Sequence, residues 1–217
     1  MAREISTIVG RYDTGMAETS APYILVLYYS AGGAVRRMAE LIAEGIERVP
    51  GAQARLRTVP KVSSGFDGEV SSIPENGPPF CENRDLEECA GVALGSPTRF
   101  GNMAAPLKAF LDATGPLWLK GALIGKPACV FTSTGAMHGG QETTLLSMML
   151  PLLHHGMLIA GLPYSNPELN ATRTGGTPYG ASHFGGIADD LPISDAERAL
   201  CVAQGRRLAE IALRLKA

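Results

Sequence analysis

A continuous apolar run at residues 24–28, followed at once by a turn of small residues and an amphipathic stretch, constrains this chain most. An unbroken apolar run of this length is typical of a strand that is buried on both faces of a parallel sheet. The next apolar side chains recur at helical spacing, with charged residues between them: Val35, Met38, Ala39, Ile42, Ile46 and Val49. This spacing predicts an amphipathic helix that ends at Pro50-Gly51. Strand, tight turn and helix together form the opening of an α/β unit.

The same alternation continues to the end of the chain. Further strands are expected at residues 54–59, 91–95, 127–132 and 157–162, and further helices at 104–114, 141–155 and from 195 onward. Ser194 and Glu197 have the spacing of a capping box at the start of the last helix. Residues 61–81 and 165–193 are rich in Gly and Pro and are expected as loops, the second long enough to be functional or to lie at an interface. The pattern predicts a three-layer α/β sandwich around a five-stranded parallel sheet of order 2-1-3-4-5.

Length, charge and cysteine spacing limit the number of domains, the kinds of partner and the location that this chain can have. The 217 residues suit one domain, expected at residues 22–217, with residues 1–21 as a flexible N-terminal extension. A formal net charge of -2 leaves no basic surface for nucleic acid, and no apolar stretch is long enough to span a bilayer. The four cysteines form no C-x-x-C pair, which favours reduced thiols and a cytoplasmic location.

Three turns follow the first, third and fourth predicted strands, and they carry the candidate binding residues. The first is Ser30, Ala31, Gly32, Gly33, Ala34 and Val35; the second contains Pro97, Thr98, Arg99, Phe100 and Gly101; the third contains Ser133, Thr134, Gly135, Ala136, Met137 and His138. The carboxyl ends of parallel strands lie at one edge of a sheet, so these turns should build one site for a flat, phosphorylated ligand. The nucleoside-triphosphate motif G-x-x-x-x-G-K-[ST] and the dinucleotide motif G-x-G-x-x-G are both absent after the first strand. Taken by itself, each turn could equally be an ordinary connection between a strand and a helix, with no role in binding.

Two adjacent histidines and the single tryptophan are further candidates for a functional role. His154 and His155 are adjacent, so on a helix they point about 100° apart and do not share one metal; no metal site is expected. Trp118 either packs at the end of a helix or stacks on a substrate.

Several segments together resemble the WrbA-type NAD(P)H:quinone oxidoreductases, a flavodoxin-like family. The similar segments are LVLYYS at 25–30, GSPTRFGNM at 95–103, FLDATGPLW at 110–118, TSTG at 132–135, GGQE at 139–142, HHGM at 154–157 and GGTPYGA at 175–181. The resemblance implies FMN as cofactor, NADH or NADPH as co-substrate, quinones as substrates, and a homotetramer built as a dimer of dimers.

The resemblance also implies roles for single residues. Residues 30–35 would hold the FMN phosphate, residues 97–101 would line the flavin ring, and residues 133–138 would contact the ring and ribityl chain. His154 would reach the flavin across a subunit interface, and Trp118 would form a wall of the substrate pocket. The reaction is expected as a two-electron relay in which the cofactor carries the chemistry, so no protein side chain is assigned as catalytic.

The chain departs from the family at the first and third turns. Gly32 stands where an aromatic or hydroxyl residue is usual, Ala34 replaces His or Asn, and Met137-His138 lengthen a loop that is usually nearly all glycine. Loss of one side-chain hydrogen bond to a charged phosphate costs about 1.5–3 kcal/mol. FMN is therefore expected to bind more weakly than is usual for the family. Two alternatives stay open: a flavodoxin-type electron carrier, and a flavin-free paralogue that acts as an interaction protein.

Overall fold

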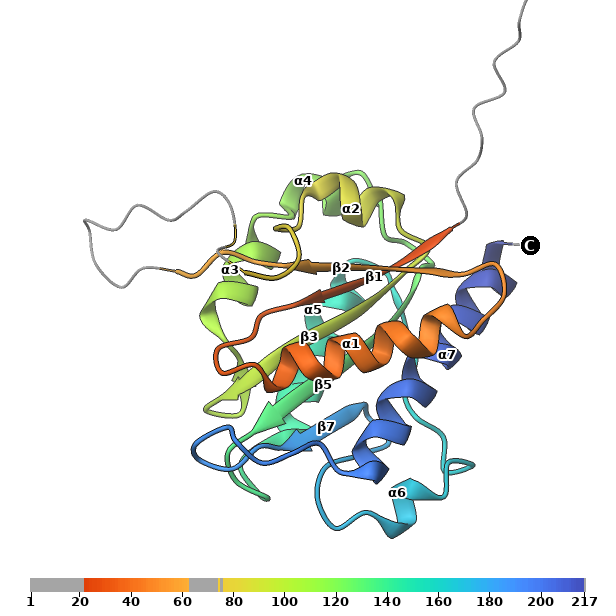
Figure 1. The fold of residues 1–217 in the computed structure, drawn as a ribbon. Helices are drawn as coiled ribbons and strands as arrows, with labels where there is room; N and C mark the ends of the chain where they lie inside the picture. The colour runs from red at the N-terminus through yellow and green to blue at the C-terminus, as the bar shows by residue number, and fades with distance from the viewer. Residues whose placement is uncertain (1–21, 63–73, 75, 217) are drawn as a thin grey trace, which may run out of the picture.

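The first apolar run forms an inner strand of a parallel sheet. The computed structural model describes residues 22–62, 74 and 76–216, so the expected extension at residues 1–21 and much of the predicted loop at 61–81 lie outside the described residues. Strands β1 (Tyr23–Tyr28), β2 (Gln53–Thr58), β3 (Gly91–Arg99), β5 (Pro127–Thr134) and β6 (Leu158–Ile159) pair in the order β2-β1-β3-β5-β6 (Figure 1). All of these pairs are parallel, which confirms the predicted order.

Helices cover both faces of this sheet. On one face lie α1 (Ala34–Glu47) and α7 (Asp195–Lys216); on the other lie α2 (Asn83–Glu88), α3 (Ala105–Asp112), α4 (Gly115–Leu119) and α5 (Gln141–His154). Ile24 and Val26 pack into the core of the first face, while Leu25 and Leu27 pack into the core of the second. The unbroken apolar run therefore reflects burial on both faces, and the three-layer sandwich is confirmed.

Helices α1 and α7 approach each other closely because glycine stands at their crossing. A Cβ on Gly45 would overlap the carbonyl of Val202, and a Cβ on Gly205 would overlap the carbonyl of Ile42. Close packing of this pair brings the N-terminus of α1 near the segment that leads into α7 (Figure 1).

At the fifth strand of the sheet, the structure differs from the sequence prediction. A single strand was expected at residues 157–162, but β6 covers only Leu158–Ile159 and pairs with Pro127 and Ala128 of β5. The same edge of β5 is completed by β7 (Ala181–Phe184), which pairs with Phe131–Thr134. Residues 160–180 therefore interrupt one strand position, with the short helix α6 (Glu168–Ala171) among them. The Leu162 N–H donates to the Pro178 carbonyl at 2.9 Å instead of to β5, so the chain leaves β5 before the predicted strand end. The short sequence of β7, with Ser182 and His183 at its middle, gave little strand signal.

Two smaller elements were also not predicted. The two-residue strand β4 (Asn102–Met103) pairs antiparallel with the end of β3, and the short helix α4 follows α3, which itself matches the predicted helix at 104–114.

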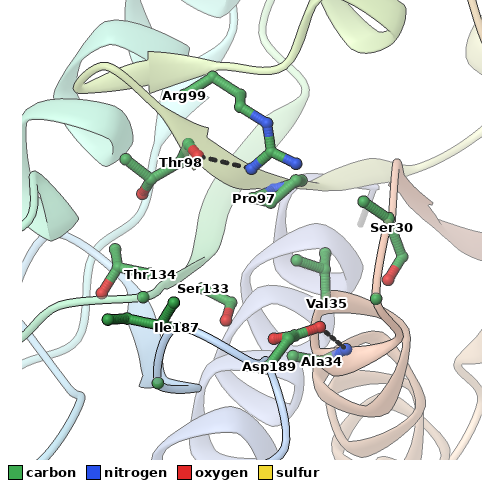
Figure 2. A pocket seen from close by; sticks show the side chains of 14 residues that line it. Ser30, Ala34, Val35, Pro97, Thr98, Arg99, Ser133, Thr134, Ile187 and Asp189 are labelled. Carbon is green, nitrogen blue, oxygen red and sulfur yellow. Dashed lines mark hydrogen bonds between the residues drawn. The ribbon is translucent and has the colours of Figure 1, made fainter.

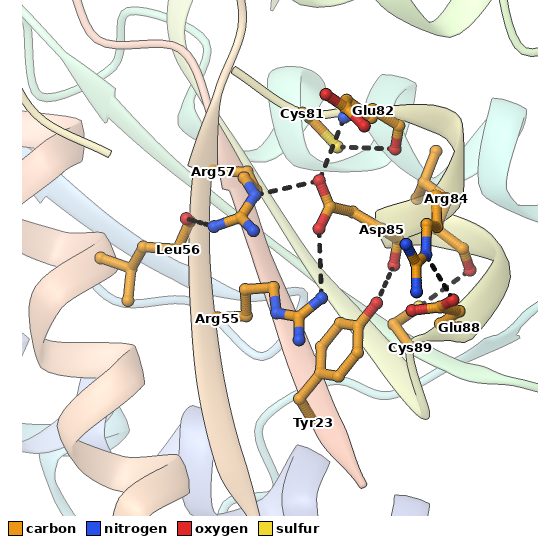
Figure 3. A network of polar contacts seen from close by, with 11 residues as sticks. Tyr23, Arg55, Leu56, Arg57, Cys81, Glu82, Arg84, Asp85, Glu88 and Cys89 are labelled. Atoms are coloured by element: carbon orange, nitrogen blue, oxygen red, sulfur yellow. Dashed lines mark hydrogen bonds and ion pairs between the residues drawn. The ribbon is translucent and has the colours of Figure 1, made fainter. Parts of the chain in front are cut away.

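Helix α2 is held to the edge strand by an ion-pair network. Asp85 accepts from Arg57 Nε at 2.9 Å and from Arg55 Nη1 at 3.3 Å, while Tyr23 donates its hydroxyl to the Asp85 carbonyl (Figure 3). Burial raises the pKa of Asp85, but hydrogen bonds from the Glu82 backbone and from Arg57 outweigh it and hold that pKa below its usual value. These long-range contacts, together with a capping box between Glu82 and Asp85, hold this helix in place.

A buried carboxylate ties β7 and its flanking loops to α7. Glu197 is 1% exposed and accepts hydrogen bonds from the backbone N–H groups of Gly175 (2.8 Å), Phe184 (3.0 Å) and Ser194 (2.8 Å), and its Oε2 lies 3.0 Å from His183 Nδ1. Ser194 Oγ accepts from the Glu197 N–H, so the predicted capping box is confirmed. Burial alone would raise the pKa of Glu197, but the bonds from His183, Ser194 and Phe184 lower it to about 2.

The Glu197→Gln variant should lose stability in a pH-dependent way. The folded pKa lies below the unfolded value, so the charged carboxylate stabilises the fold above about pH 4.5, and this contribution is lost as the pH falls toward 2. We expect the variant to be about 3 kcal/mol less stable than the wild type at pH 7, with the gap shrinking below pH 4.5. Urea unfolding at a series of pH values measures it.

Glu210→Gln on the same helix is the matched control. Glu210 lies 3.6 Å from Arg206 in an exposed pair, so its loss should change stability by no more than about 0.5 kcal/mol. If the difference in unfolding free energy between the wild type and Glu197→Gln stays constant from pH 7 to pH 2, the charge of Glu197 does not have the stabilising role assigned to it.

Candidate functional site

The three predicted turns meet around one cavity of about 200 Å³ at the carboxyl edge of the sheet (Figure 2). The cavity is lined from the first turn by Ser30, Ala31, Gly32, Ala34 and Val35, from the second by Pro97, Thr98 and Arg99, from the third by Ser133, Thr134 and Gly135, and from a fourth segment by Gly186, Ile187 and Asp189. The parallel register of β1, β3 and β5 brings the first three groups together.

The first turn is folded around the Ser30 hydroxyl. Ser30 Oγ accepts the backbone N–H groups of Gly33 at 3.1 Å and of Arg36 at 3.3 Å. Gly33 has a φ of 106°, a left-handed conformation that favours glycine and lets the chain enter α1 directly. The turn thus presents backbone N–H groups at the positive end of a 14-residue helix, where an anionic oxygen is stabilised.

The second turn extends the sheet into the site. β3 continues to Arg99, and the chain returns through Phe100 and Gly101, whose φ values are 52° and 76°. The Thr98 hydroxyl accepts from Thr144 Oγ1 at 3.1 Å, and the Arg99 guanidinium donates to the Thr98 carbonyl at 2.9 Å. Arg99 therefore lies at the cavity edge with most of its N–H donors free of that bond.

Phe100 and Gly101 do not line the cavity. Phe100 is fully exposed, so its side chain does not pack into the core. A fully exposed aromatic ring on a left-handed residue is unusual, since this conformation costs a non-glycine residue of order 1 kcal/mol.

The third turn contributes only its first half. Ser133, Thr134 and Gly135 line the cavity, and Thr134 Oγ1 donates to the Ala136 carbonyl at 2.9 Å. Ala136, Met137 and His138 lie outside the lining. Gln141 holds this part of the loop by donating to the Met137 carbonyl at 3.0 Å.

Trp118 and His154 lie together, away from the residues that line the cavity. Trp118 Nε1 donates to the His154 carbonyl at 3.0 Å, and about half of the tryptophan side chain is exposed. Trp118 therefore packs at a helix end in this chain, and its exposed part remains free to meet another surface. The side chain of the neighbouring His155 lies against Thr114, with 2.9 Å between His155 Nε2 and Thr114 Oγ1.

The fourth segment was not among the predicted site residues. Asp189 accepts the Ala34 N–H at 3.4 Å, and the loop that carries it begins directly after β7. The length of the predicted loop at 165–193 was the one signal in the sequence for a functional role there. No periodicity linked Asp189 to the first turn, because 155 residues separate it from Ala34.

The described residues contain no cluster of at least three His, Cys, Asp or Glu side chains that could hold a metal ion. Within the same part of the chain, no helix has the length and apolar character needed to cross a membrane.

The sequence matches the NADPH-dependent FMN reductase family over residues 23–166. It is 44% identical over 203 residues to a protein of Solidesulfovibrio magneticus named NAD(P)H dehydrogenase (quinone), with 89% of this chain and 99% of that protein covered. A protein of the same name from Geotalea daltonii is 46% identical over 199 residues, covering 88% of this chain and 97% of the relative.

Solved structures support the fold. A flavodoxin, WrbA-like protein from Agrobacterium tumefaciens aligns with a TM-score of 0.63 at 23% identity, covering 89% of this chain and 98% of that one. Flavodoxin 1 from Bacillus cereus aligns with a TM-score of 0.56 at 17% identity, covering 87% and 97%. The fold is flavodoxin-like.

The cavity fits FMN by its donor set. In the first turn the Ala34 N–H already faces a carboxylate oxygen, that of Asp189, at 3.4 Å, as suits a helix N-terminus. Hydroxyls of Ser133 and Thr134 face the cavity from the third turn, and Pro97 to Arg99 offer backbone and guanidinium groups to a flat heteroaromatic ring.

Ser30→Ala should weaken FMN binding about tenfold and leave riboflavin binding within about twofold, because only the phosphate ester depends on the turn that Ser30 organises. Fluorescence quenching of each flavin measures both affinities. Ser165→Ala, at an exposed position outside the cavity, is the matched control and should change neither. Equal losses for both flavins would contradict a phosphate-specific role.

Proposed function

Since the chain belongs to the NADPH-dependent FMN reductase family, we propose that it is an NAD(P)H:quinone oxidoreductase that uses FMN. One observation carries this proposal: identities of 44–46% extend over nearly the whole length of relatives named NAD(P)H dehydrogenase (quinone). The convergence of the three predicted turns on one cavity supports it independently.

We assign FMN to this cavity. The lining residues of the first turn would hold the phosphate, Pro97 to Arg99 would line the ring, and Ser133 to Gly135 would lie along the ring and the ribityl chain. FMN, when bound, accepts two electrons from NAD(P)H and passes them to the quinone. The chain's own groups would bind and orient it: backbone N–H groups at the N-terminus of α1 would face the phosphate, and the Arg99 guanidinium would offer donors to a carbonyl at the cavity edge.

NAD(P)H and the quinone are expected to use the same open side of the cavity in turn. No side chain of this chain needs to act as a general base, because the reducing equivalents move through the cofactor. This arrangement predicts parallel lines in double-reciprocal plots, and intersecting lines would argue against it.

The exposed apolar side chains around α5 support self-association. Seven large apolar residues are at least two-fifths exposed along α4, α5 and the turns beside them: Trp118, Leu119, Ile124, Leu146, Leu150, Leu153 and Leu158. Leu146, Leu150 and Leu153 share one face of α5 through their spacing, and Trp118 reaches the His154 carbonyl at the end of that helix. A contiguous apolar surface of this kind marks a protein interface.

The proposed assembly is the homotetramer that the resemblance implies. In it, His154 and the exposed part of Trp118 would lie next to the cavity of a neighbouring subunit. Cys81, Cys89, Cys129 and Cys201 are free and buried, which agrees with the proposed cytoplasmic location.

Oxidation of NADH and NADPH with benzoquinone as acceptor tests the proposed function. Turnover should require added or bound FMN. A flavin-bound protein without turnover would favour the electron carrier, and a protein that binds no flavin would favour the interaction protein.

Leu150→Glu should shift the protein from a tetramer to smaller species in light scattering at micromolar concentration, because it places a charge in the apolar face of α5. Leu215→Glu, at an equally exposed residue near the end of α7, is the control and should leave the mass unchanged. An unaltered tetramer in Leu150→Glu would exclude this face as the interface.

A further inference from the structure

The carboxylate of Asp189 occupies the place in the first turn where an anion is expected to bind. Its Oδ2 accepts the Ala34 N–H (Figure 2). Its side chain lies directly against Gly32. Ala34 is the first residue of α1, so the negative charge lies at the positive end of that helix.

Gly32 makes this contact possible. A Cβ at position 32 would overlap the Asp189 carboxylate, and its backbone is not left-handed, so no other feature of this residue calls for glycine. The space left by the missing side chain is filled by Asp189. Gly32 and the acidic residue 157 positions later therefore form one structural feature.

The loop that carries Asp189 is closed by its own backbone. Leu191 N–H donates to the Gly185 carbonyl at 3.1 Å, and Gly185 N–H donates to the Thr134 carbonyl at 2.9 Å. Asp189 itself has a φ of 55°, a conformation that Asp tolerates better than most residues. The loop is thus anchored at its base, and Asp189 lies near its tip.

The carboxylate is held only weakly. Its one hydrogen bond to the first turn is 3.4 Å long, well beyond the usual distance, and among the described residues no ion pair involves Asp189. The neighbouring acid, Asp190, is exposed. A phosphate and a carboxylate cannot share these donors, because their like charges repel and the space is the same.

We propose that Asp189 is an internal competitor for the FMN phosphate and thereby sets how strongly this site prefers FMN over riboflavin. The proposal rests on the proposed function, since it takes the cavity as the FMN site. The phosphate ester has to displace the Asp189 carboxylate from Ala34, whereas riboflavin has no phosphate and leaves the carboxylate in place. Asp189 therefore lowers affinity for the phosphorylated flavin selectively.

Flavin titrations of four proteins test this: the wild type, Asp189→Asn, Asp189→Gly and Asp190→Asn. Asn and Gly both accept the left-handed backbone, and Asp190→Asn removes the same charge one residue away without touching the first turn. We expect both Asp189 variants to bind FMN about tenfold or more tightly than the wild type and riboflavin within about twofold. Asp190→Asn should stay within about twofold for both flavins.

Three results would overturn the proposal. FMN affinity could stay unchanged or fall in both Asp189 variants, Asp190→Asn could tighten FMN as much as Asp189→Asn, or FMN and riboflavin could tighten equally. The second result would assign the effect to net charge, and the third to a loosened loop.

Thermal unfolding with inorganic phosphate in place of chloride, at equal ionic strength, separates this inference from the proposed function. Phosphate should raise the melting temperature of Asp189→Gly more than that of the wild type or Asp190→Asn. If no variant binds flavin, the proposed function fails, and the phosphate result alone decides: a selective rise supports competition by Asp189, and equal shifts overturn it.

Discussion

The parallel alignment of β1, β3 and β5 is the constraint on which the site depends. Register pairs run from Ile24 opposite Gly91 to Tyr28 opposite Gly95, and β3 pairs in turn with β5 up to Pro97 and Ser133. Strands that run in the same direction end at the same edge, so the turns after them share one cavity. The buried core on both faces holds this register, because a slip by one residue would exchange side chains of different size between two close-packed cores.

Glu197 extends this arrangement to a part of the chain that the central strands do not reach. It gathers the N–H groups of Gly175, Phe184 and Ser194 and thereby fixes the segment from β7 into α7. β7 then completes the fifth strand position beside β5, and the loop after it enters the cavity as a fourth wall. A buried carboxylate with four partners is a rigid support, since each missing bond would leave a buried charge less well solvated.

The first turn shows how a glycine admits a distant side chain to a site. Because Gly32 has no side chain, Asp189 enters from a distant loop and accepts the Ala34 N–H at the start of α1. The helix end keeps an anionic partner while its access to an external phosphate is altered. Affinity for a phosphorylated ligand in such a site depends on the competition between two anions as well as on the number of donors.

Local pattern alone determined most of the fold and the position of the cavity. The apolar runs, the helical spacing and the small-residue turns predicted the strand order, the three layers and eleven of the fourteen lining residues, because these features follow from burial and from neighbours along the chain. Tertiary structure decided the rest. The division of the fifth strand into β6 and β7, the attachment of α2 through Asp85 and the entry of Asp189 into the first turn each join residues far apart in the sequence. Such contacts involve polar side chains with no periodicity, so their partners are set only when the chain has folded and distant carboxylates and N–H groups meet.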